Sequence, residues 1–378
     1  MTLGHVVVAG ASLAGVRAAQ TLRAEGFDGR ITVVGAEHHP PYDRPPLSKQ
    51  VLTGTWEPSR ATLDLSRLDA DLELGTAVAG LDPASRQVTL SDGRVLPFDG
   101  AILATGARPR WPAAPPLPGV HVLRTLDDCL AIREAFRSGP RVVIVGAGFI
   151  GAEVAASART CGLDVTIVDP LPLPLVRVLG TELGQACARL QEDNGVTVRC
   201  GVAVTGFRGG ARVEEVVLDD GSALAADLVV VGIGVIPNTE WLSSSGLPVE
   251  DGVVCDEFCA VDRDRRIYAA GDVARIAGRR VEHWTSAAEQ ARTAARNLLA
   301  GTGATPHASV PYFWSDQYDV KIQMVGTFAP DAAVEIVSGS LEDRRFVAVY
   351  SRDGETTGAV AFNSARELMT YRRALEGH

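Results

Sequence analysis

Two glycine-rich segments have the residue types and spacing of a turn that binds phosphate. They read Gly10-x-Ser12-x-x-Gly15 and Gly146-x-Gly148-x-x-Gly151. Each follows an apolar run and precedes a helical pattern, so each turn leads into a helix N-terminus, where backbone N–H groups and the helix dipole favour an anion. Small residues are needed because the backbone must turn tightly, approach the phosphates and let the helix pack on the strand. Both segments therefore predict a site for the pyrophosphate of a dinucleotide.

An acidic residue indicates which dinucleotide the second segment binds. Asp169 stands at the end of the next expected strand, where a carboxylate accepts hydrogen bonds from the adenosine ribose and repels a 2′-phosphate. Pro170 and Leu171 follow, where a site for NADP would offer arginine. We therefore expect NADH rather than NADPH, with Asp169 as a plain turn residue as the alternative. In the first segment Ser12 replaces the middle glycine, and its hydroxyl is small enough to approach a phosphate and donate to it.

The elements that position these turns occur twice along the chain. Each half begins with a strand, the glycine turn, a helix and a second strand, expected at 31–34 and 165–168. Asp-Gly hairpin turns follow at 92–93 and 220–221, and each hairpin leads to a strand that ends in glycine. Matching segments in the same order indicate two homologous dinucleotide-binding domains.

The expected fold is therefore α/β, with two duplicated Rossmann-like dinucleotide-binding domains and a small α+β C-terminal domain. The first domain is discontinuous and comprises residues 1–108 and 238–309. The second, which contains Asp169, comprises residues 109–237 and is the expected NAD-binding domain. The third comprises residues 310–378, where short alternating strands close on a helix.

The composition argues against several other classes of protein. The 378 residues carry a net charge of −10, whereas a nucleic-acid binder normally shows a basic face. No stretch approaches the roughly 20 apolar residues of a membrane span, and the N-terminus lacks the basic segment of a signal peptide, so we expect a cytoplasmic protein. The six cysteines form no Cys-x-x-Cys and no zinc-type cluster, so no metal site is expected. We expect Cys255 and Cys259 to be buried structural thiols rather than a redox pair.

A proline-rich segment precedes the hairpin of the first half. It reads Pro40-Pro41-Tyr42-Asp43-Arg44-Pro45-Pro46-Leu47-Ser48-Lys49, and its four prolines predict an extended, stiff loop with exposed charges at Asp43, Arg44 and Lys49. Such a loop can place cations beside a long anionic cofactor. By composition alone it is equally compatible with an ordinary connector.

This loop, together with the two glycine turns, resembles the FAD-dependent ferredoxin reductases of bacterial oxygenase systems, the putidaredoxin reductase-like family. The resemblance runs from Val6 to about Tyr371 and includes the segments 123–126, 267–272, 282–284 and Phe313-Trp314-Ser315-Asp316-Gln317-Tyr318. It implies a disulfide-reductase-like flavoprotein fold, with FAD in the first domain and NADH in the second. It also implies that a hydride passes from NADH to FAD and that electrons then pass singly to an iron–sulfur ferredoxin, with the protein supplying binding and orientation.

The resemblance also implies site residues. FAD is expected to contact Ala14, Lys49, Val78, Arg124, Asp272 and Trp284. Lys49 is expected to pair with Glu153 close to the flavin, and these two are the catalytic candidates; the alternative for Glu153 is a carboxylate that only favours its helix N-terminus. The remaining cofactor-binding candidates are Gly10, Ser12, Gly15, Glu37, Arg44, Gly146, Gly148, Ile150, Gly151, Asp169, Arg177 and Gly234. Many relatives have an acid at position 36 for the FAD ribose; here Ala36 stands there, and we expect Glu37 to take over.

Two residues are candidates for contact with the ferredoxin. Arg292 offers a positive charge for an acidic partner, and Trp314 offers an aromatic contact or electron-exit group. An ordinary solvated arginine and a tryptophan that packs between domains are equally compatible with the sequence. Two other functions are alternatives to a ferredoxin reductase. A disulfide reductase or NADH oxidase needs a reactive cysteine early in the first domain, and no cysteine precedes Cys129. A redox sensor that binds FAD and NADH but turns over slowly remains the alternative.

Overall fold

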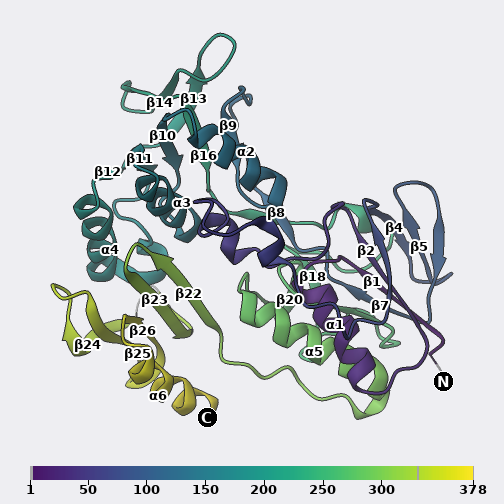
Figure 1. Ribbon diagram of the computed structural model, residues 1–378. Helices are drawn as coiled ribbons and strands as arrows, with labels where there is room; N and C mark the ends of the chain where they lie inside the picture. Colours follow the sequence, from purple (N-terminus) through teal and green to yellow (C-terminus); the bar gives the residue numbers. More distant parts are fainter. Residues whose placement is uncertain (1–2, 330–331, 378) are drawn as a thin grey trace. The chain divides into compact units, whose positions relative to one another are not determined.

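Each glycine turn follows a buried parallel strand in the structure, a computed structural model that describes residues 3–329 and 332–377 (Figure 1). The chain divides into two units. The first unit comprises Met1–Asp43, Thr62–Arg108 and Ile236–Pro311, and the second comprises Arg44–Ala61, Pro109–Val235 and Tyr312–His378. Short strands β8 (Ala107–Pro109) and β17 (Val235–Pro237) lie where the chain passes from one unit to the other.

The first unit is built on a parallel five-stranded sheet in the order β19-β7-β1-β2-β3. Its strands are β1 (His5–Ala9), β2 (Arg30–Gly35), β3 (Asp71–Leu74), β7 (Gly100–Leu103) and β19 (Ile267–Ala269). Helices α1 (Leu13–Ala24) and α5 (Trp284–Ala300) pack on each other, and their buried alanines allow this close approach. Two small sheets complete the unit: β4 (Val78–Asp82), β5 (Gln87–Leu90) and β6 (Val95–Pro97), and β18 (Val253–Cys255), β20 (Ala274–Ile276) and β21 (Arg279–Arg280).

The second unit repeats this plan with a parallel sheet in the order β12-β11-β10-β16-β9. Its strands are β9 (Val120–Val122), β10 (Arg141–Val145), β11 (Asp164–Asp169), β12 (Thr197–Cys200) and β16 (Leu228–Val231). Its helices are α2 (Leu126–Phe136), α3 (Phe149–Thr160) and α4 (Val176–Asp193), and a hairpin sheet contains β13 (Val204–Arg208), β14 (Glu215–Leu218) and β15 (Ala223–Ala225). In both sheets the strand before the glycine turn is central. Strands β1 and β10 are apolar on successive residues because both faces of a parallel sheet are covered.

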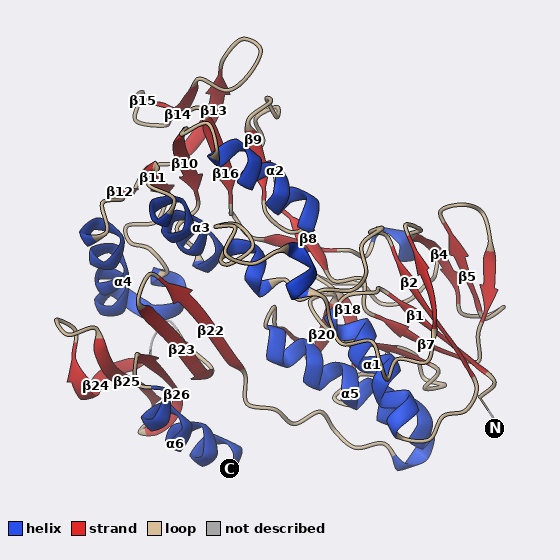
Figure 2. Ribbon diagram, in the orientation of Figure 1, coloured by secondary structure: helices blue, strands red, loops and turns tan. Residues whose placement is uncertain are grey.

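The second unit also contains the C-terminal sheet, which is antiparallel (Figure 2). Its strands are β22 (Tyr312–Gln317), β23 (Val320–Gly326), β24 (Ala333–Ser340), β25 (Arg345–Arg352) and β26 (Glu355–Phe362), followed by α6 (Ala365–Glu376). One buried cluster joins this sheet to α4, with Phe346 and Phe362 beside Leu179 and Leu183. The sheet therefore shares a core with the elements of the second unit.

The expected duplication is confirmed, including the second strand and the Asp-Gly hairpin of each half. Gly93 and Gly221 both adopt the positive φ that a tight hairpin turn requires. Among the described residues, no helix combines the length and the apolarity needed to cross a membrane.

The proline-rich segment differs from its prediction as an extended loop. Pro45 begins a 3₁₀ helix, η1 (Pro45–Ser48), with prolines at its first two positions, and a second 3₁₀ turn, η2 (Pro58–Ala61), follows. Proline suits the start of a helical turn because its φ is already correct and its missing N–H has no partner to lose there. The charged side chains are half-buried, not exposed, and that of Lys49 is 12% exposed.

Candidate active site and cofactor sites

The first glycine turn lies between β1 and α1. Gly10 has a φ of 123°, and a Cβ on it would come within 2.1 Å of the Ala104 carbonyl oxygen. A Cβ on Gly15 would lie 1.8 Å from the carbonyl oxygen of Gly10, so close packing of helix and strand excludes any side chain there. Ser12 is the N-cap residue of α1, but its side chain makes no capping hydrogen bond. Its hydroxyl at the helix N-terminus is therefore not used to cap the helix.

The second glycine turn lies between β10 and α3, and its three glycines differ in how closely they are packed. Cβ atoms on Gly146 and Gly151 would lie 2.4 Å and 2.0 Å from backbone oxygens. At Gly148, the N-cap of α3, no atom lies within 4 Å of an added Cβ. Ile150, the second residue of α3, is 46% exposed despite its apolar side chain. The protein's own packing therefore requires the outer glycines, whereas the middle position faces open space.

Asp169 ends β11 and is tied to the glycine turn. Its Oδ2 accepts a hydrogen bond of 2.7 Å from the Ala147 N–H, and its Oδ1 accepts one of 2.8 Å from the Leu171 N–H. These bonds hold the carboxylate beside the turn that would carry a pyrophosphate. Each oxygen keeps a second lone pair for another donor.

The corresponding place in the first unit follows β2. Ala36 is exposed, and Glu37 is half-buried and accepts a hydrogen bond from the Tyr42 hydroxyl. Glu37 thus supplies a fixed carboxylate next to the position where Ala36 offers none.

Lys49 and Glu153 form a buried ion pair in the second unit. Lys49 Nζ lies 2.7 Å from Glu153 Oε2, and the Glu153 side chain is 3% exposed. Ser48 Oγ donates to the same oxygen at 2.5 Å, and Ser315 Oγ donates to Oε1 at 2.7 Å. The expected pairing of Lys49 with Glu153 is confirmed, and Glu153 lies beyond the first turn of α3, which argues against the alternative that it only favours the helix N-terminus.

Neighbouring helices fix the segment that carries Lys49. Cys129 Sγ on α2 donates to the Leu47 carbonyl oxygen at 3.1 Å, and Ser157 Oγ on α3 donates to that of Ser48 at 2.6 Å. Arg44 donates to the main-chain oxygen of Arg124, which brings two of the candidate cations together.

The other FAD candidates of the first unit gather around the end of β19 and the start of α5. A Cβ on Gly271 would lie 3.1 Å from the Ala14 Cβ, so Ala14 on α1 contacts the glycine that precedes Asp272. Trp284 begins α5, and its indole donates to Asp43 Oδ1 at 2.8 Å. Ser286 Oγ, on the first turn of α5, is buried and has no hydrogen-bond partner among the described residues. A buried hydroxyl without a partner is costly, so this region fits a polar ligand.

The remaining candidates lie at separate positions in the two units. Val78 begins β4 and packs partly against the core of the first unit, and Arg292 is exposed on α5. In the second unit Arg177 is exposed at the start of α4, Trp314 is half-buried on β22, and Gly234 has a φ of 98° with open space around it. Trp314 stacks on Tyr312 of the same strand, with ring centroids 6.1 Å apart.

The cysteines and histidines supply no further chemistry. Cys255 and Cys259 are both buried, as expected, and burial raises the pKa of Cys255 to about 12. Burial also lowers the pKa of His283, the N-cap of α5, to about 4, so its ring is neutral near pH 7. Among the residues that the structure describes, no group of histidine, cysteine and carboxylate side chains is arranged to hold a metal ion.

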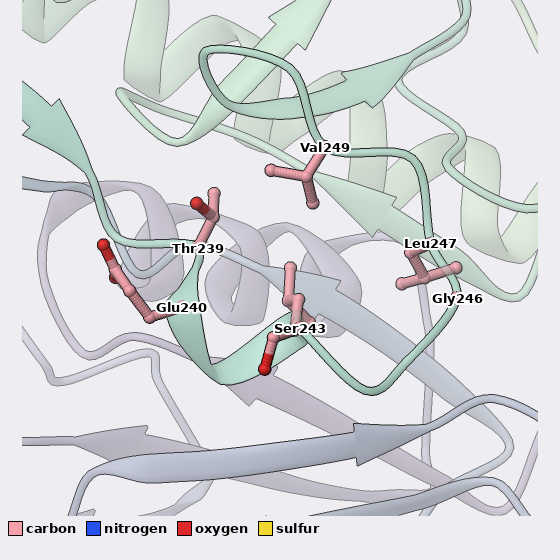
Figure 3. A pocket seen from close by; sticks show the side chains of 7 residues that line it. Thr239, Glu240, Ser243, Gly246, Leu247 and Val249 are labelled. Carbon is pink, nitrogen blue, oxygen red and sulfur yellow. The ribbon is translucent and has the colours of Figure 1, made fainter.

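One pocket was not anticipated from the sequence. It lies on the segment 239–249 of the first unit, and its lining includes Thr239, Glu240 and Ser243 beside Leu247 and Val249 (Figure 3). No repeated glycine or proline pattern marks this segment, so nothing in the sequence predicts the pocket.

The residues present fit two bound dinucleotides. The N-termini of α1 and α3 lack side-chain caps, the middle position of each turn is small or open, and a carboxylate stands near each turn. These features are what an adenine dinucleotide needs from a βαβ unit.

Comparison with known proteins gives the same result. Residues 4–291 match the family described as pyridine nucleotide-disulphide oxidoreductase, and residues 312–378 match the reductase C-terminal family. The chain is 38% identical to the ferredoxin–NAD(+) reductase component of the anthranilate 1,2-dioxygenase system of Burkholderia cepacia, over 99% of this chain and 95% of that protein. It is 38% identical to rhodocoxin reductase of Rhodococcus erythropolis, over 98% and 89%.

Solved structures of similar proteins cover the whole chain as well. The putidaredoxin reductase in a covalent complex with putidaredoxin superposes with a TM-score of 0.93 at 35% identity, over 99% of this chain and 93% of that one. The ferredoxin reductase for the CYP199A2 system from Rhodopseudomonas palustris also gives 0.93, at 37% identity over 98% and 93%.

Proposed function

We propose that this chain, which belongs to the pyridine nucleotide-disulphide oxidoreductase family and to its ferredoxin–NAD(+) reductases, passes electrons from NADH through FAD to a ferredoxin that serves an oxygenase. The observation that carries the proposal is the pair of matching glycine turns on two equivalent parallel sheets, one of them open at Gly148 beside Asp169. One chain with two such turns can hold an electron donor and a flavin at once.

The first unit is proposed to hold FAD. Gly10, Ser12 and Gly15 would receive the pyrophosphate at the N-terminus of α1, and Glu37 would accept from the adenosine ribose. We assign Asp272 and Trp284 to the flavin-bearing portion of the cofactor. We also assign Lys49 and Arg124 to FAD, as cations.

The second unit is proposed to hold NADH. Gly146, Gly148 and Gly151 would receive its pyrophosphate, and Asp169 would accept from the ribose hydroxyls and disfavour a 2′-phosphate. Ile150 and Gly234 offer an apolar face and an open backbone position, and Arg177 an additional cation.

The bound flavin supplies the redox chemistry, because it accepts two electrons as a hydride from NADH and releases them singly to an iron–sulfur centre. The protein's contribution is orientation and charge. Lys49 keeps an ammonium at a fixed place because Glu153 holds it, and burial prevents water from screening that pair. We further propose that the protein acts in the cytoplasm and that Arg292 and Trp314 contact the ferredoxin.

The test uses the purified protein. It should be yellow, lose its flavin absorbance when NADH is added without oxygen, and reduce cytochrome c only when a ferredoxin is also present. A panel of ferredoxins would identify the acceptor. A long-lived NADH complex with negligible turnover against every ferredoxin would contradict the proposal and favour a redox sensor.

A further inference from the structure

We propose that Ser315, on β22, is a positioning residue for the reaction, because it holds the Glu153 carboxylate that in turn fixes Lys49. The inference rests on the proposed function, which places the Lys49–Glu153 pair beside the flavin. Ser315 belongs to the C-terminal sheet and lies far along the chain from both partners.

The geometry leaves the carboxylate no freedom to turn. Ser315 Oγ donates to one oxygen at 2.7 Å, while Lys49 Nζ and Ser48 Oγ approach the other at 2.7 Å and 2.5 Å. Ser315 is fully buried, as Ser48 and Glu153 nearly are. An ionised carboxylate only accepts hydrogen bonds, and three donors converge on this one, as a buried charge requires.

A second row of polar side chains orients Ser315. Gln317 Nε2 donates to Ser315 Oγ at 3.2 Å, and Gln191 Nε2 donates to Gln317 Oε1 at 3.0 Å. The Tyr318 hydroxyl donates to Gln191 Oε1 at 2.8 Å. Every bond in this series donates toward Glu153, so the dipoles add at the carboxylate. Because two members are amides, which do not relay protons as hydroxyls do, the series orients the carboxylate instead of conducting a proton.

The series explains why β22 carries polar residues inside a core. Ser315 and Gln317 point inward and are fully buried, whereas Asp316 between them pairs with Lys321 at the surface. Phe313 on the same strand packs on Phe149 of α3, with ring centroids 4.5 Å apart, so the strand is held against the helix that carries Glu153. The C-terminal sheet therefore contributes a residue to the proposed active site as well as a covering surface.

The experiment is a double-mutant cycle on the FAD-loaded protein with Ser315→Ala, Glu153→Gln and the double variant. Single-turnover flavin reduction by NADH is followed, together with the midpoint potential of the flavin. We expect Ser315→Ala to lower the rate constant by roughly 10- to 100-fold, the size of one lost hydrogen bond to a buried charge, with the Kd for NADH unchanged. The potential should become more negative because the lysine charge is less firmly held, and both effects should largely vanish in the Glu153→Gln background.

Ser364→Ala, which removes another buried serine of the same sheet region, is the control and should change neither quantity. If Ser315→Ala does not fold, Ser315→Cys takes its place in the cycle, because a thiol has a similar size but is only a weak hydrogen-bond donor. Equal effects of Ser315→Ala with and without Glu153 would overturn the inference. Flavin reduction by NADH and the midpoint potential both require no ferredoxin, so the cycle still decides the inference if the wild-type protein fails to reduce any ferredoxin.

Discussion

At the scale of single residues, the glycines of the second turn are expected to have different roles, one in binding and one in folding. Gly148 faces open space, whereas a Cβ on Gly151 would lie 2.0 Å from a backbone oxygen. We therefore expect Gly148→Ala to leave the free energy of unfolding within about 0.5 kcal/mol of wild type but to raise the KM for NADH at least tenfold, because the methyl group occupies the pyrophosphate site. Gly151→Ala should instead lower the free energy of unfolding by several kcal/mol, roughly the cost of overpacking.

Urea unfolding and steady-state kinetics on the same preparations distinguish these two outcomes. An unchanged KM in Gly148→Ala would mean that NADH does not approach this turn. Neither effect depends on the identity of the electron acceptor, since the KM for NADH can be measured with ferricyanide and urea unfolding needs no acceptor.

Asp169 gives a second prediction at this scale. Its carboxylate accepts from the Ala147 N–H at 2.7 Å, so the side chain that we propose to accept from the ribose also shapes the turn. Asp169→Ala should lower kcat/KM for NADH at least tenfold and narrow the preference for NADH over NADPH, since the repulsion of a 2′-phosphate is removed. Asp164→Ala, at the exposed other end of β11, is the matched control. A preference that stays at its wild-type value would assign cofactor choice to other residues.

At the scale of elements, α2 shows how local sequence positions the site. Thr125 caps α2 in a capping box with Asp128, whose Oδ2 also accepts from the Arg124 N–H at 3.1 Å. We expect Thr125→Ala to lower the free energy of unfolding by about 1 kcal/mol, because the Asp128 N–H loses its hydrogen bond to the Thr125 hydroxyl. It should also weaken FAD retention, because Asp128, whose carboxylate accepts from the Arg124 N–H, is then held less firmly. FAD release during dialysis, read from absorbance, checks the second effect, and Ser138→Ala beyond the end of α2 serves as the control.

The elements of the fold were predictable where the pattern was local. The apolar run 142–145 predicts a buried strand, and each Asp-Gly pair predicts a hairpin turn from its own residue types. Both parallel sheets and their hairpins were therefore predictable from the sequence. The 3₁₀ helix η1 was missed because prolines favour both an extended chain and a helical first turn, and only the contacts of Leu47 and Ser48 decide between them. The partners of Glu153 were only partly predictable. Ser315 lies on a strand of another sheet, and no spacing rule links it to α3.

At the scale of the whole molecule, net charge raises a problem for partner docking. The chain carries −10, and an acidic ferredoxin would be repelled unless a local positive charge faces it. We expect Arg292→Glu to lower the rate of ferredoxin reduction at least fivefold while ferricyanide reduction with NADH is unchanged. The wild-type rate should fall steeply with salt. The same charge change at the exposed Arg137, the C-cap of α2, is the control. Equal losses of rate in both variants would show that the net charge of the protein, and not the position of Arg292, causes the effect.

Stability should also depend on pH through buried histidines. Burial lowers the pKa of His283 to about 4, and it lowers the pKa values of His5, His121 and His307 as well. An unfolded histidine titrates near 6.5, so between these values the unfolded chain binds more protons than the folded one, and stability rises with pH. The contribution is fully present above about pH 6.5 and is lost as the pH falls toward 4; for His283 it amounts to about 3 kcal/mol.

Urea unfolding at about pH 7.5 and about pH 5 measures this loss. His283→Gln keeps a polar side chain without a titrating ring. The difference in unfolding free energy between the two pH values should therefore shrink by about 2 kcal/mol, and not by the full contribution, because about pH 5 is still above the folded pKa of His283. The matched change at the exposed His38 is the control. A difference that His283→Gln leaves unaltered would contradict the prediction. It would mean that folding does not lower the pKa of His283, because the charge of the Asp272 carboxylate offsets the effect of burial.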